Sequence, residues 1–337
     1  MQRTLYQLKA GSLKNMKLIE EGLSALGPQE VSVQVKAIGL NFADVFAIWG
    51  LYKATPPGLF TPGLEYAGEI IAVGSEVTSV KVGDQVMGVT RFGAYATHLN
   101  IDHRYVIPLP EGWTHEEGAA YLVQVLTAYY GLQELGAIKE KQIVLIHSAA
   151  GGVGIWANRI AKAYNCFTIG TVGNQSKIQF CKDEGYDKVI VRGKDFPEKL
   201  SEALGELPLN LVMECIGGKI LSQSYEATAP MGRVIVYGSA QYASPGNRPN
   251  LFRMIPLYLS RPRLDPQNMT AENKSVMAFN LIFLFEHADI MHKILTELQP
   301  LSLGKPYVGH VFPFNELPSA IRLFQTGKTM GKIIIQP

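Results

Sequence analysis

The chain has 337 residues, of which 47% are hydrophobic and 9% aromatic, which is enough to bury a large core and predicts two domains. The formal net charge is only +2 and no basic run stands out, so the composition argues against a nucleic-acid-binding protein. The first residues lack the apolar region of a signal peptide, and the longest apolar stretch, residues 276–285, contains Asn280 and is too short to span a bilayer. A soluble cytoplasmic protein without a transmembrane segment is therefore expected.

Residues 1 to about 120 have the pattern of a β-rich unit. Residues 30–38 alternate apolar and polar side chains, which is typical of a strand with one face in a core. Residues 69–74 and 84–89 predict further strands, and turn residues such as Gly27-Pro28 separate the strands at short intervals. This spacing indicates a barrel or a sandwich.

The character of the sequence changes near Trp113. Thr114 lies three residues before Glu117, a spacing that predicts a helix capping box. Helical segments then alternate with short apolar strands, which predicts right-handed βαβ units and a parallel sheet covered on both faces. The predicted strands are residues 143–146, 167–172, 187–191, 209–214 and 232–238. We place a domain boundary at residue 124 and a nucleotide-binding domain over residues 125–285.

The most informative stretch is residues 142–154, in which a β-branched run ends in the cluster Ala149-Ala150-Gly151-Gly152-Val153-Gly154. Residues 155–163 follow without a helix breaker, so a helix should start at the last glycine. A strand, a glycine turn and a helix together aim free backbone N–H groups and the positive end of the helix dipole at one point. We therefore interpret the cluster as the pyrophosphate cradle of a dinucleotide-binding fold.

The residues after the second predicted strand of this unit bear on the type of dinucleotide. An NAD enzyme usually places an acid there, about 20 residues past the glycines, to bind both ribose hydroxyls. Residues 171–177 contain no acid, and Lys177 ends the polar run Gly173-Asn174-Gln175-Ser176. A 2′-phosphate, with nearly two negative charges, suits this arrangement and favours NADP(H); a solvated lysine early in a helix is the alternative reading of Lys177.

A charged hydrogen bond to phosphate is worth about 1.5 to 3 kcal/mol. Lys177→Ala is therefore expected to weaken NADPH binding roughly 10- to 150-fold and to leave NADH binding nearly unchanged. Fluorescence titration of both nucleotides tests the assignment.

The last part of the chain returns to a β-like pattern. Residues 307–312 and 332–335 have strand character and flank one predicted helix over residues 316–325. We expect the returning segment, residues 286–337, to rejoin the first domain. The predicted fold is therefore α/β, with a doubly wound parallel Rossmann sheet and a β-rich domain that the C-terminal tail completes.

Several motifs, in a consistent order, resemble one family over essentially the whole chain. They are residues 39–44 (Gly-Leu-Asn-Phe-Ala-Asp), 50–52, 62–68 (Pro-Gly-Leu-Glu-Tyr-Ala-Gly), 126–129 and 279–281, together with the glycine cluster. The chain resembles the medium-chain dehydrogenase/reductase superfamily, and within it the zinc-free quinone oxidoreductase branch. Within that branch, the amino-acid sequences of the motifs most resemble those of the vesicle amine transport (synaptic vesicle membrane) protein group. The resemblance implies a GroES-like barrel for the first domain.

The zinc-dependent relatives in this superfamily present a cysteine where this chain has Asn41 and a histidine where it has Leu64. No cysteine precedes Cys166, so the four-cysteine lobe of those relatives is also missing. Zinc needs three or four thiolate, imidazole or carboxylate ligands, and these residues supply neither the catalytic nor the structural site. Glu65 remains beside Leu64, and we interpret it as fixing the barrel turn. No metal is expected.

The resemblance also implies which residues form the site. Asn41, Tyr52 and Asp44 are the implied catalytic residues; packing on the barrel is the alternative for Tyr52, and capping of a local turn is the alternative for Asp44. The implied cofactor contacts are Asn41, Thr127, Ala150, Gly151, Gly152, Val153, Gly154, Gly173, Asn174, Ser176, Lys177, Arg192, Gly238, Phe279 and Lys332. Relatives usually have tyrosine at the position of Arg192, so both a phosphate clamp and a plain surface arginine are open readings.

Hydride transfer builds negative charge on a substrate oxygen, and without a metal the hydrogen-bond donors of the protein must stabilise it. Quinones and α,β-unsaturated carbonyls are already activated by conjugation, so we expect NADPH-dependent reduction of such a small molecule. The alternative is an NADPH-binding, vesicle- or membrane-associated adaptor or lipid-handling protein with little turnover, although no lipidation signal or basic amphipathic helix is evident. Residues 250–265 are expected either to line the substrate mouth or to face a partner.

Residues 276–281 are predicted to form the last, exposed strand of the Rossmann sheet. Exposed sheet edges are usually covered. Pairing with the same strand of a second subunit, as in relatives, predicts a homodimer, and a strand shielded within one chain is the alternative.

Overall fold

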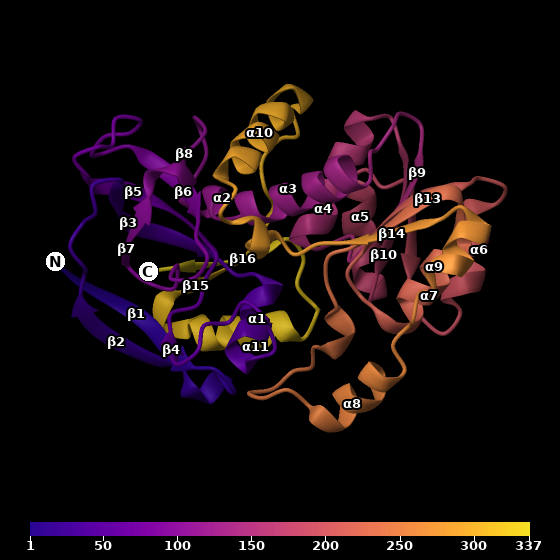
Figure 1. The fold of residues 1–337 in the computed structure, drawn as a ribbon, viewed down its shortest axis with the longest axis horizontal. Coiled ribbons are helices and arrows are strands. Elements are labelled where there is room, and N and C mark those ends of the chain that lie inside the picture. Colours follow the sequence, from indigo (N-terminus) through magenta and orange to yellow (C-terminus); the bar gives the residue numbers. More distant parts are fainter.

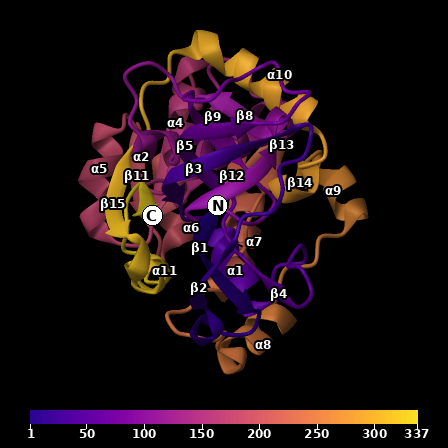
Figure 2. The same ribbon diagram turned by 90° about the vertical axis from the view of Figure 1, so that its left-hand side faces the viewer.

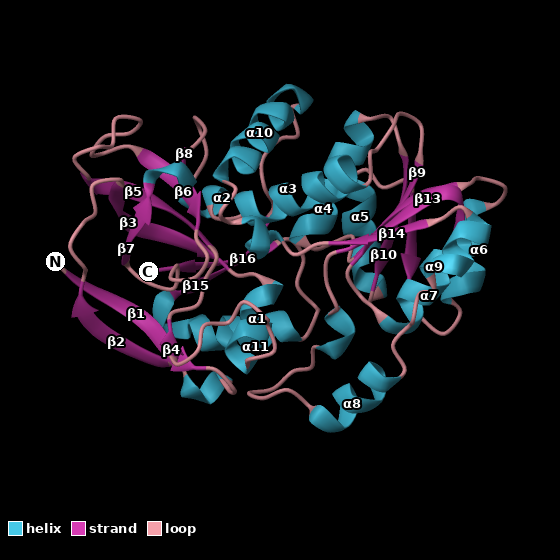
Figure 3. Cartoon of the chain, viewed as in Figure 1, coloured by secondary structure: helices cyan, strands magenta, loops and turns pink.

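The computed structural model of the protein describes residues 1–337. A β-rich half and a half built on a parallel sheet lie side by side, with helices between them (Figures 1 and 3). Both ends of the chain lie on the β-rich side (Figure 2). No helix of the structure has the length and apolar character needed to cross a membrane.

The β-rich half contains a seven-stranded sheet with the order β15-β16-β3-β5-β6-β8, in which β7 also pairs with β3. Its strands are β3 (Glu30–Gly39), β5 (Glu65–Val73), β6 (Gln85–Val89), β7 (His98–Asp102), β8 (Val106–Pro108), β15 (Val308–Pro313) and β16 (Lys332–Gln336). A smaller sheet has the order β2-β1-β4 and consists of β1 (Gln2–Lys9), β2 (Lys17–Gly22) and β4 (Leu59–Phe60). Because β16 pairs with β3, the C-terminal tail completes this half, as predicted.

The second half is a six-stranded parallel sheet with the order β11-β10-β9-β12-β13-β14. Its strands are β9 (Ile143–His147), β10 (Phe167–Val172), β11 (Lys188–Val191), β12 (Leu209–Glu214), β13 (Thr228–Val236) and β14 (Ser275–Ala278). From β9 the strand order runs outward to β10 and β11, and the chain then returns to the other side of β9 with β12, β13 and β14. In such sheets, ligands bind at the carboxyl ends of the strands beside this switch point. The predicted doubly wound sheet is confirmed.

The helices cover the sheet and join the two halves (Figure 3). They are α1 (Phe42–Trp49), α2 (His115–Gly118), α3 (Leu122–Tyr129), α4 (Gly152–Ala163), α5 (Ile178–Asp183), α6 (Phe196–Leu204), α7 (Gly218–Ala227), α8 (Leu251–Leu259), α9 (Pro266–Glu272), α10 (Ala288–Leu298) and α11 (Leu317–Gln325). The predicted capping box forms at α2, where the Thr114 hydroxyl accepts the Glu117 N–H at 3.2 Å. Helix α8 projects from the lower side of the molecule in both views (Figures 1 and 2).

Several local details differ from the sequence prediction, among them the last strand of the parallel sheet, β14, which ends at Ala278 and not at residue 281. Helix α4 begins at Gly152 rather than Gly154, because the tight turn before it is made by Ser148, whose φ of 53° is left-handed. Strand β13 lies over Thr228–Val236 rather than residues 232–238, since it begins directly after α7. The strands β1 and β2 were not among the predicted elements.

The C-terminal segment also contacts the parallel-sheet half. Gly331 forms a parallel bridge with Gly151, and its N–H donates to the Ala150 carbonyl at 2.8 Å. Lys332, the next residue, is therefore held beside the glycine cluster while it begins strand β16 of the other half.

Candidate active site

The glycine cluster lies at the carboxyl end of β9, the central strand at the reversal point of the sheet. A side chain at Gly154 would place its Cβ 2.5 Å from the Ser148 carbonyl oxygen, and one at Gly152 would lie 2.6 Å from Gln124 Cγ. The clash at Gly154 is with fixed backbone, so that position admits no side chain, whereas a side chain at Gly152 would require Gln124 to move. We call Ala149 to Gly154 the cradle.

A second group of predicted residues gathers beside the cradle, at the ends of β10 and β11. We call this group, Gly173, Asn174, Ser176, Lys177 and Arg192, the β10 corner. The side chain of Asn174 accepts the Ser176 N–H at 2.9 Å, which fixes the turn after β10. No acidic residue belongs to the β10 corner, in agreement with the residue pattern.

The two cations of the β10 corner differ in what they contact. The Lys177 ammonium donates to the Gly327 and Thr329 carbonyls at 2.7 and 2.6 Å, and only 9% of the residue is exposed. The Arg192 Nη1 donates to the Thr171 carbonyl and hydroxyl at 3.0 and 2.7 Å. Burial, together with the charge of Arg192, lowers the pKa of Lys177, and burial lowers the pKa of Arg192.

A buried polar network lies where the two halves meet. Its members, each at most 5% exposed, are Asn41, Glu65, Gln124 and Lys332. The Asn41 amide donates to Glu65 Oε1 at 2.9 Å, and its oxygen accepts from Gln124 at 2.7 Å and from Lys332 at 2.9 Å. Lys332 also forms an ion pair with Glu65. Burial lowers the pKa of Lys332, while the neighbouring Glu65 and Asp44 charges oppose that shift.

Sequence reasoning missed part of this network. Gln124 was not singled out, because a glutamine within a helical pattern carries no signal of its own. Glu65 was interpreted as fixing the barrel turn; its second oxygen does accept the Val123 N–H at 3.1 Å, at the start of α3. Its pairing with Lys332 was not foreseen, because these residues lie 267 positions apart.

Asp44 lies just behind Asn41 in α1. Its carboxylate accepts the Asn41 N–H at 2.8 Å and the Tyr95 hydroxyl at 2.9 Å, and only 1% of the residue is exposed. Burial raises the pKa of Asp44 to about 7. The side chain thus caps the start of α1, which was the alternative considered for it, and a catalytic role stays a prediction.

Tyr52 follows α1 and points to the other half of the molecule. Its hydroxyl donates to Asn280 Oδ1 at 2.7 Å, and burial raises its pKa to about 12. The hydroxyl is therefore tied to the turn after β14 and keeps its proton at neutral pH.

The remaining predicted contacts lie on the elements around the junction. The Thr127 hydroxyl donates to the Val123 carbonyl of its own helix at 2.6 Å. Phe279 follows β14 and its ring lies 5.0 Å from that of Tyr130. A Cβ added at Gly238, which follows β13, would lie 3.2 Å from the Cys215 Cβ. The roles of all these residues toward a cofactor stay predictions.

The donor set at the junction does not fit zinc. Asn41 is a neutral amide, Leu64 has no donor atom, and the Glu65 carboxylate is already paired with Lys332. No group of three or more His, Cys, Asp or Glu side chains is arranged so that it could hold a metal ion.

Comparison with known proteins agrees with the fold. Residues 27–111 match the family described as "Alcohol dehydrogenase GroES-like domain", and residues 152–278 match the one described as "Zinc-binding dehydrogenase". The chain belongs to the medium-chain dehydrogenase/reductase superfamily of oxidoreductases, as the sequence motifs predicted. The second description names zinc, whereas the family resemblance places Asn41 and Leu64 where zinc-dependent relatives have ligands.

Individual relatives place the chain near two groups. It is 32% identical to "Synaptic vesicle membrane protein VAT-1 homolog" from Rattus norvegicus, over 93% of this chain and 78% of that protein. It is 35% identical to "Quinone oxidoreductase" from Pseudomonas aeruginosa, over 80% of this chain and 83% of that protein. The crystal structure of Escherichia coli quinone oxidoreductase complexed with NADPH superposes with a TM-score of 0.86 at 27% identity, covering 99% of this chain and 100% of that chain.

Proposed function

We propose that the protein is an NADPH-dependent, zinc-independent reductase that transfers hydride to a quinone or an α,β-unsaturated carbonyl. The observation that carries the proposal is the buried polar network beside the cradle. Gln124 of the network packs against Gly152, and Lys332 follows the residue that bonds Ala150. A nicotinamide bound from the cradle would therefore meet an amide and an ammonium where zinc-dependent relatives hold their metal.

The residues fit a dinucleotide with a 2′-phosphate. The cradle, in which Gly154 admits no side chain, would hold the pyrophosphate, and the cations of the β10 corner would hold the 2′-phosphate. Thr127, Gly238 and Phe279 surround the junction and would position the nicotinamide. Bound NADPH supplies the hydride that the reaction needs.

The chain's own donors would stabilise the charge that develops on the substrate oxygen. The Asn41 amide donates to Glu65 at 2.9 Å and, more weakly, to the Gly39 carbonyl at 3.3 Å, while Tyr52 donates to Asn280. A substrate oxygen would thus replace Gly39 or Asn280 as the acceptor. The Lys332 ammonium donates to the Asn41 oxygen and so orients the Asn41 amide for this role.

The reductase proposal is tested by NADPH oxidation with a panel of quinones and enones, with saturated ketones as the comparison. Turnover of the conjugated substrates alone is expected, because saturated ketones need stronger activation. Asn41→Ala is expected to lower kcat about 10²- to 10³-fold, as loss of an oxyanion donor does. Absence of turnover with every conjugated acceptor would contradict the proposal.

Helix α8 supports a second candidate function, a membrane-associated adaptor. No residue of α8 is buried, and Phe252 is 95% exposed. Arg253 lies in the helix, Arg248, Arg261 and Arg263 flank it, and no acid occurs between residues 240 and 264. The structure thus contains an exposed apolar helix with basic residues on both sides, which the sequence pattern did not reveal, and such a segment suits an anionic lipid surface.

Liposome flotation separates the two functions. An adaptor would float with vesicles containing phosphatidylserine and would lose this behaviour in Phe252→Ser, whereas neutral phosphatidylcholine vesicles would not carry it. Flotation without turnover on any acceptor would favour the adaptor, and turnover without flotation would favour the reductase.

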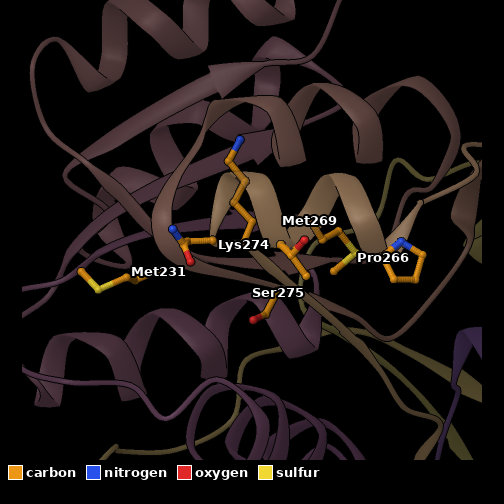
Figure 4. Close-up of a pocket in the computed structure, with 7 residues that line it drawn as sticks. Met231, Pro266, Met269, Lys274 and Ser275 are labelled. Atoms are coloured by element: carbon orange, nitrogen blue, oxygen red, sulfur yellow. The ribbon is translucent and has the colours of Figure 1, made fainter.

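The open edge at β14 supports the proposed homodimer. Strand β14 has no neighbour beyond β13, and Met231 beside it is 86% exposed. A shallow depression lined by Met231, Pro266, Met269, Thr270, Asn273, Lys274 and Ser275 lies at this edge (Figure 4). Pairing of two β14 strands would cover it. A monomer mass in light scattering at micromolar concentration would contradict the homodimer.

A further inference from the structure

The β10 corner holds one buried cation, Lys177, and one half-buried cation, Arg192, and neither is in direct contact with a carboxylate. Burial lowers the pKa of Arg192 and the charge of the buried Glu214 opposes that shift, but Glu214 acts without an ion pair. No carboxylate oxygen lies within 4.0 Å of the Lys177 or Arg192 nitrogens. Buried charges are ordinarily paired, because an unpaired one loses its hydration without compensation. An unpaired cation pair of this kind is compensated when a dianion binds between its members.

From this arrangement we infer that Arg192, rather than Lys177, is the main determinant of 2′-phosphate binding and so of the preference for NADPH over NADH. The inference rests on the proposed NADPH-dependent function. It assigns a role to a residue that differs from the tyrosine usual in the resembling family.

Arg192 is held by a buried chain of hydrogen bonds. Its Nη1 donates to the Thr171 hydroxyl, which lies 2.7 Å from His147 Nδ1, and His147 Nε2 lies 2.9 Å from the Ser224 hydroxyl. His147, Thr171 and Ser224 are fully buried. The guanidinium is therefore positioned before any ligand arrives, which reduces the ordering cost of binding.

The opposite edge of the same guanidinium has no protein partner. Only Nη1 of Arg192 donates to the protein, so Nη2 and Nε remain for a ligand. Nη2 lies 3.5 Å from the position of a Cβ at Gly173, directly over the turn that ends at Lys177. Two adjacent N–H groups of a planar guanidinium match two oxygens of one phosphate, so the free edge is suited to bidentate binding.

Lys177, in contrast, already has a structural task. Two of its three ammonium hydrogens go to the Gly327 and Thr329 carbonyls, which belong to the loop between α11 and β16. At most one hydrogen is left for a phosphate. Lys177 thus contributes mainly charge to the β10 corner, and Arg192 contributes both charge and directed hydrogen bonds.

Titration calorimetry with 2′,5′-ADP and with 5′-AMP tests the inference without catalysis. These probes share the adenosine and differ in the 2′-phosphate. Arg192→Gln is expected to weaken 2′,5′-ADP binding roughly 10- to 150-fold and to leave 5′-AMP binding unchanged. Arg192→Lys keeps the charge but loses the planar guanidinium, so its affinity for 2′,5′-ADP should lie between those of the wild type and Arg192→Gln. Lys177→Met should lose less than Arg192→Gln, and the exposed Arg322→Gln should match the wild type.

The outcomes separate this inference from the proposed function. An unchanged preference for 2′,5′-ADP in Arg192→Gln, or a larger loss in Lys177→Met, would overturn the role of Arg192. Failure of the wild-type protein to prefer 2′,5′-ADP would overturn it together with the NADPH assignment. Loss of the preference in Arg192→Gln alone, in a protein that reduces no quinone or enone, would support Arg192 and reject the reductase. If Arg192→Gln does not fold, the ratio of the affinities for 2′,5′-ADP and 5′-AMP in Arg192→Lys decides instead.

Discussion

The polar network and the β10 corner each contain a cation largely removed from solvent, but only the one in the polar network is in direct contact with a carboxylate. Lys332 is 4% exposed and is surrounded by Glu65, Asn41 and Gln124, so its charge is neutralised within the protein. Arg192 is anchored through neutral groups of Thr171 and has no carboxylate partner. The difference indicates that Lys332 is part of the folded framework at the junction, whereas Arg192 is kept available for an anion.

The largest expected loss of folding free energy comes from breaking the ion pair between Lys332 and Glu65. Glu65→Gln leaves the Lys332 ammonium without its carboxylate, and removal of one partner of a buried pair costs about 3 to 5 kcal/mol of folding free energy. Urea unfolding monitored by circular dichroism measures this loss. The double variant Glu65→Gln/Lys332→Met removes both charges and should recover most of it; a double variant as unstable as the single one would contradict the pairing.

Lys177→Met should have the next largest effect on stability. It removes the donor of the Gly327 and Thr329 carbonyls. Gly327 is exposed and its carbonyl can bond water instead, so the expected loss is that of one charged hydrogen bond, about 1.5 to 3 kcal/mol. The same urea series gives the loss, and limited proteolysis should show new cleavage near residues 326–330. A variant with wild-type stability and no new cleavage would show that Lys177 does not hold this loop.

The anchor of Arg192 predicts a dependence of stability on pH. Burial lowers the pKa of His147 well below its usual value of about 6.5. Below that pH the unfolded chain binds a proton at His147 and the folded chain does not, so stability should fall with decreasing pH by at most about 1.4 kcal/mol per pH unit. Above about pH 6.5, His147 is unprotonated in both the folded and the unfolded chain, so stability no longer changes with pH through this residue. His147→Gln should flatten this slope, whereas the exposed His287→Gln should keep it; equal slopes in both would reject the explanation.

The smallest effect is expected for Arg192→Gln in nucleotide-free protein. The variant loses two hydrogen bonds to Thr171 but also removes a half-buried charge that repels Lys177, so the two changes oppose each other. The free energy of unfolding should change by less than about 1 kcal/mol. A loss as large as that of Glu65→Gln would mean that Arg192, like Lys332, belongs to the folded framework.

Local signals in the sequence predicted the fold well. The strands of the parallel sheet, the capping box at Thr114 and the cradle depend on neighbouring residues, and the family motifs added the zinc-free branch. Helix α8 was missed because its exposure depends on what the rest of the chain leaves uncovered. The pairing of Lys332 with Glu65, and of Lys177 with a loop 150 residues away, joins positions far apart in sequence. No local pattern records such contacts.

The position of β16 has a consequence for the order in which the chain folds. The sheet of the first half needs residues 332–336 between β3 and β15, whereas every strand of the parallel sheet has been synthesised by residue 278. On the ribosome, the nucleotide-binding half therefore has all of its strands before the half that was synthesised first can close its sheet. Such long-range pairing is slow and leaves a strand edge open in the meantime. During synthesis, the edge of β3 that pairs with β16 therefore stays unpaired for longer than any other strand edge of the chain.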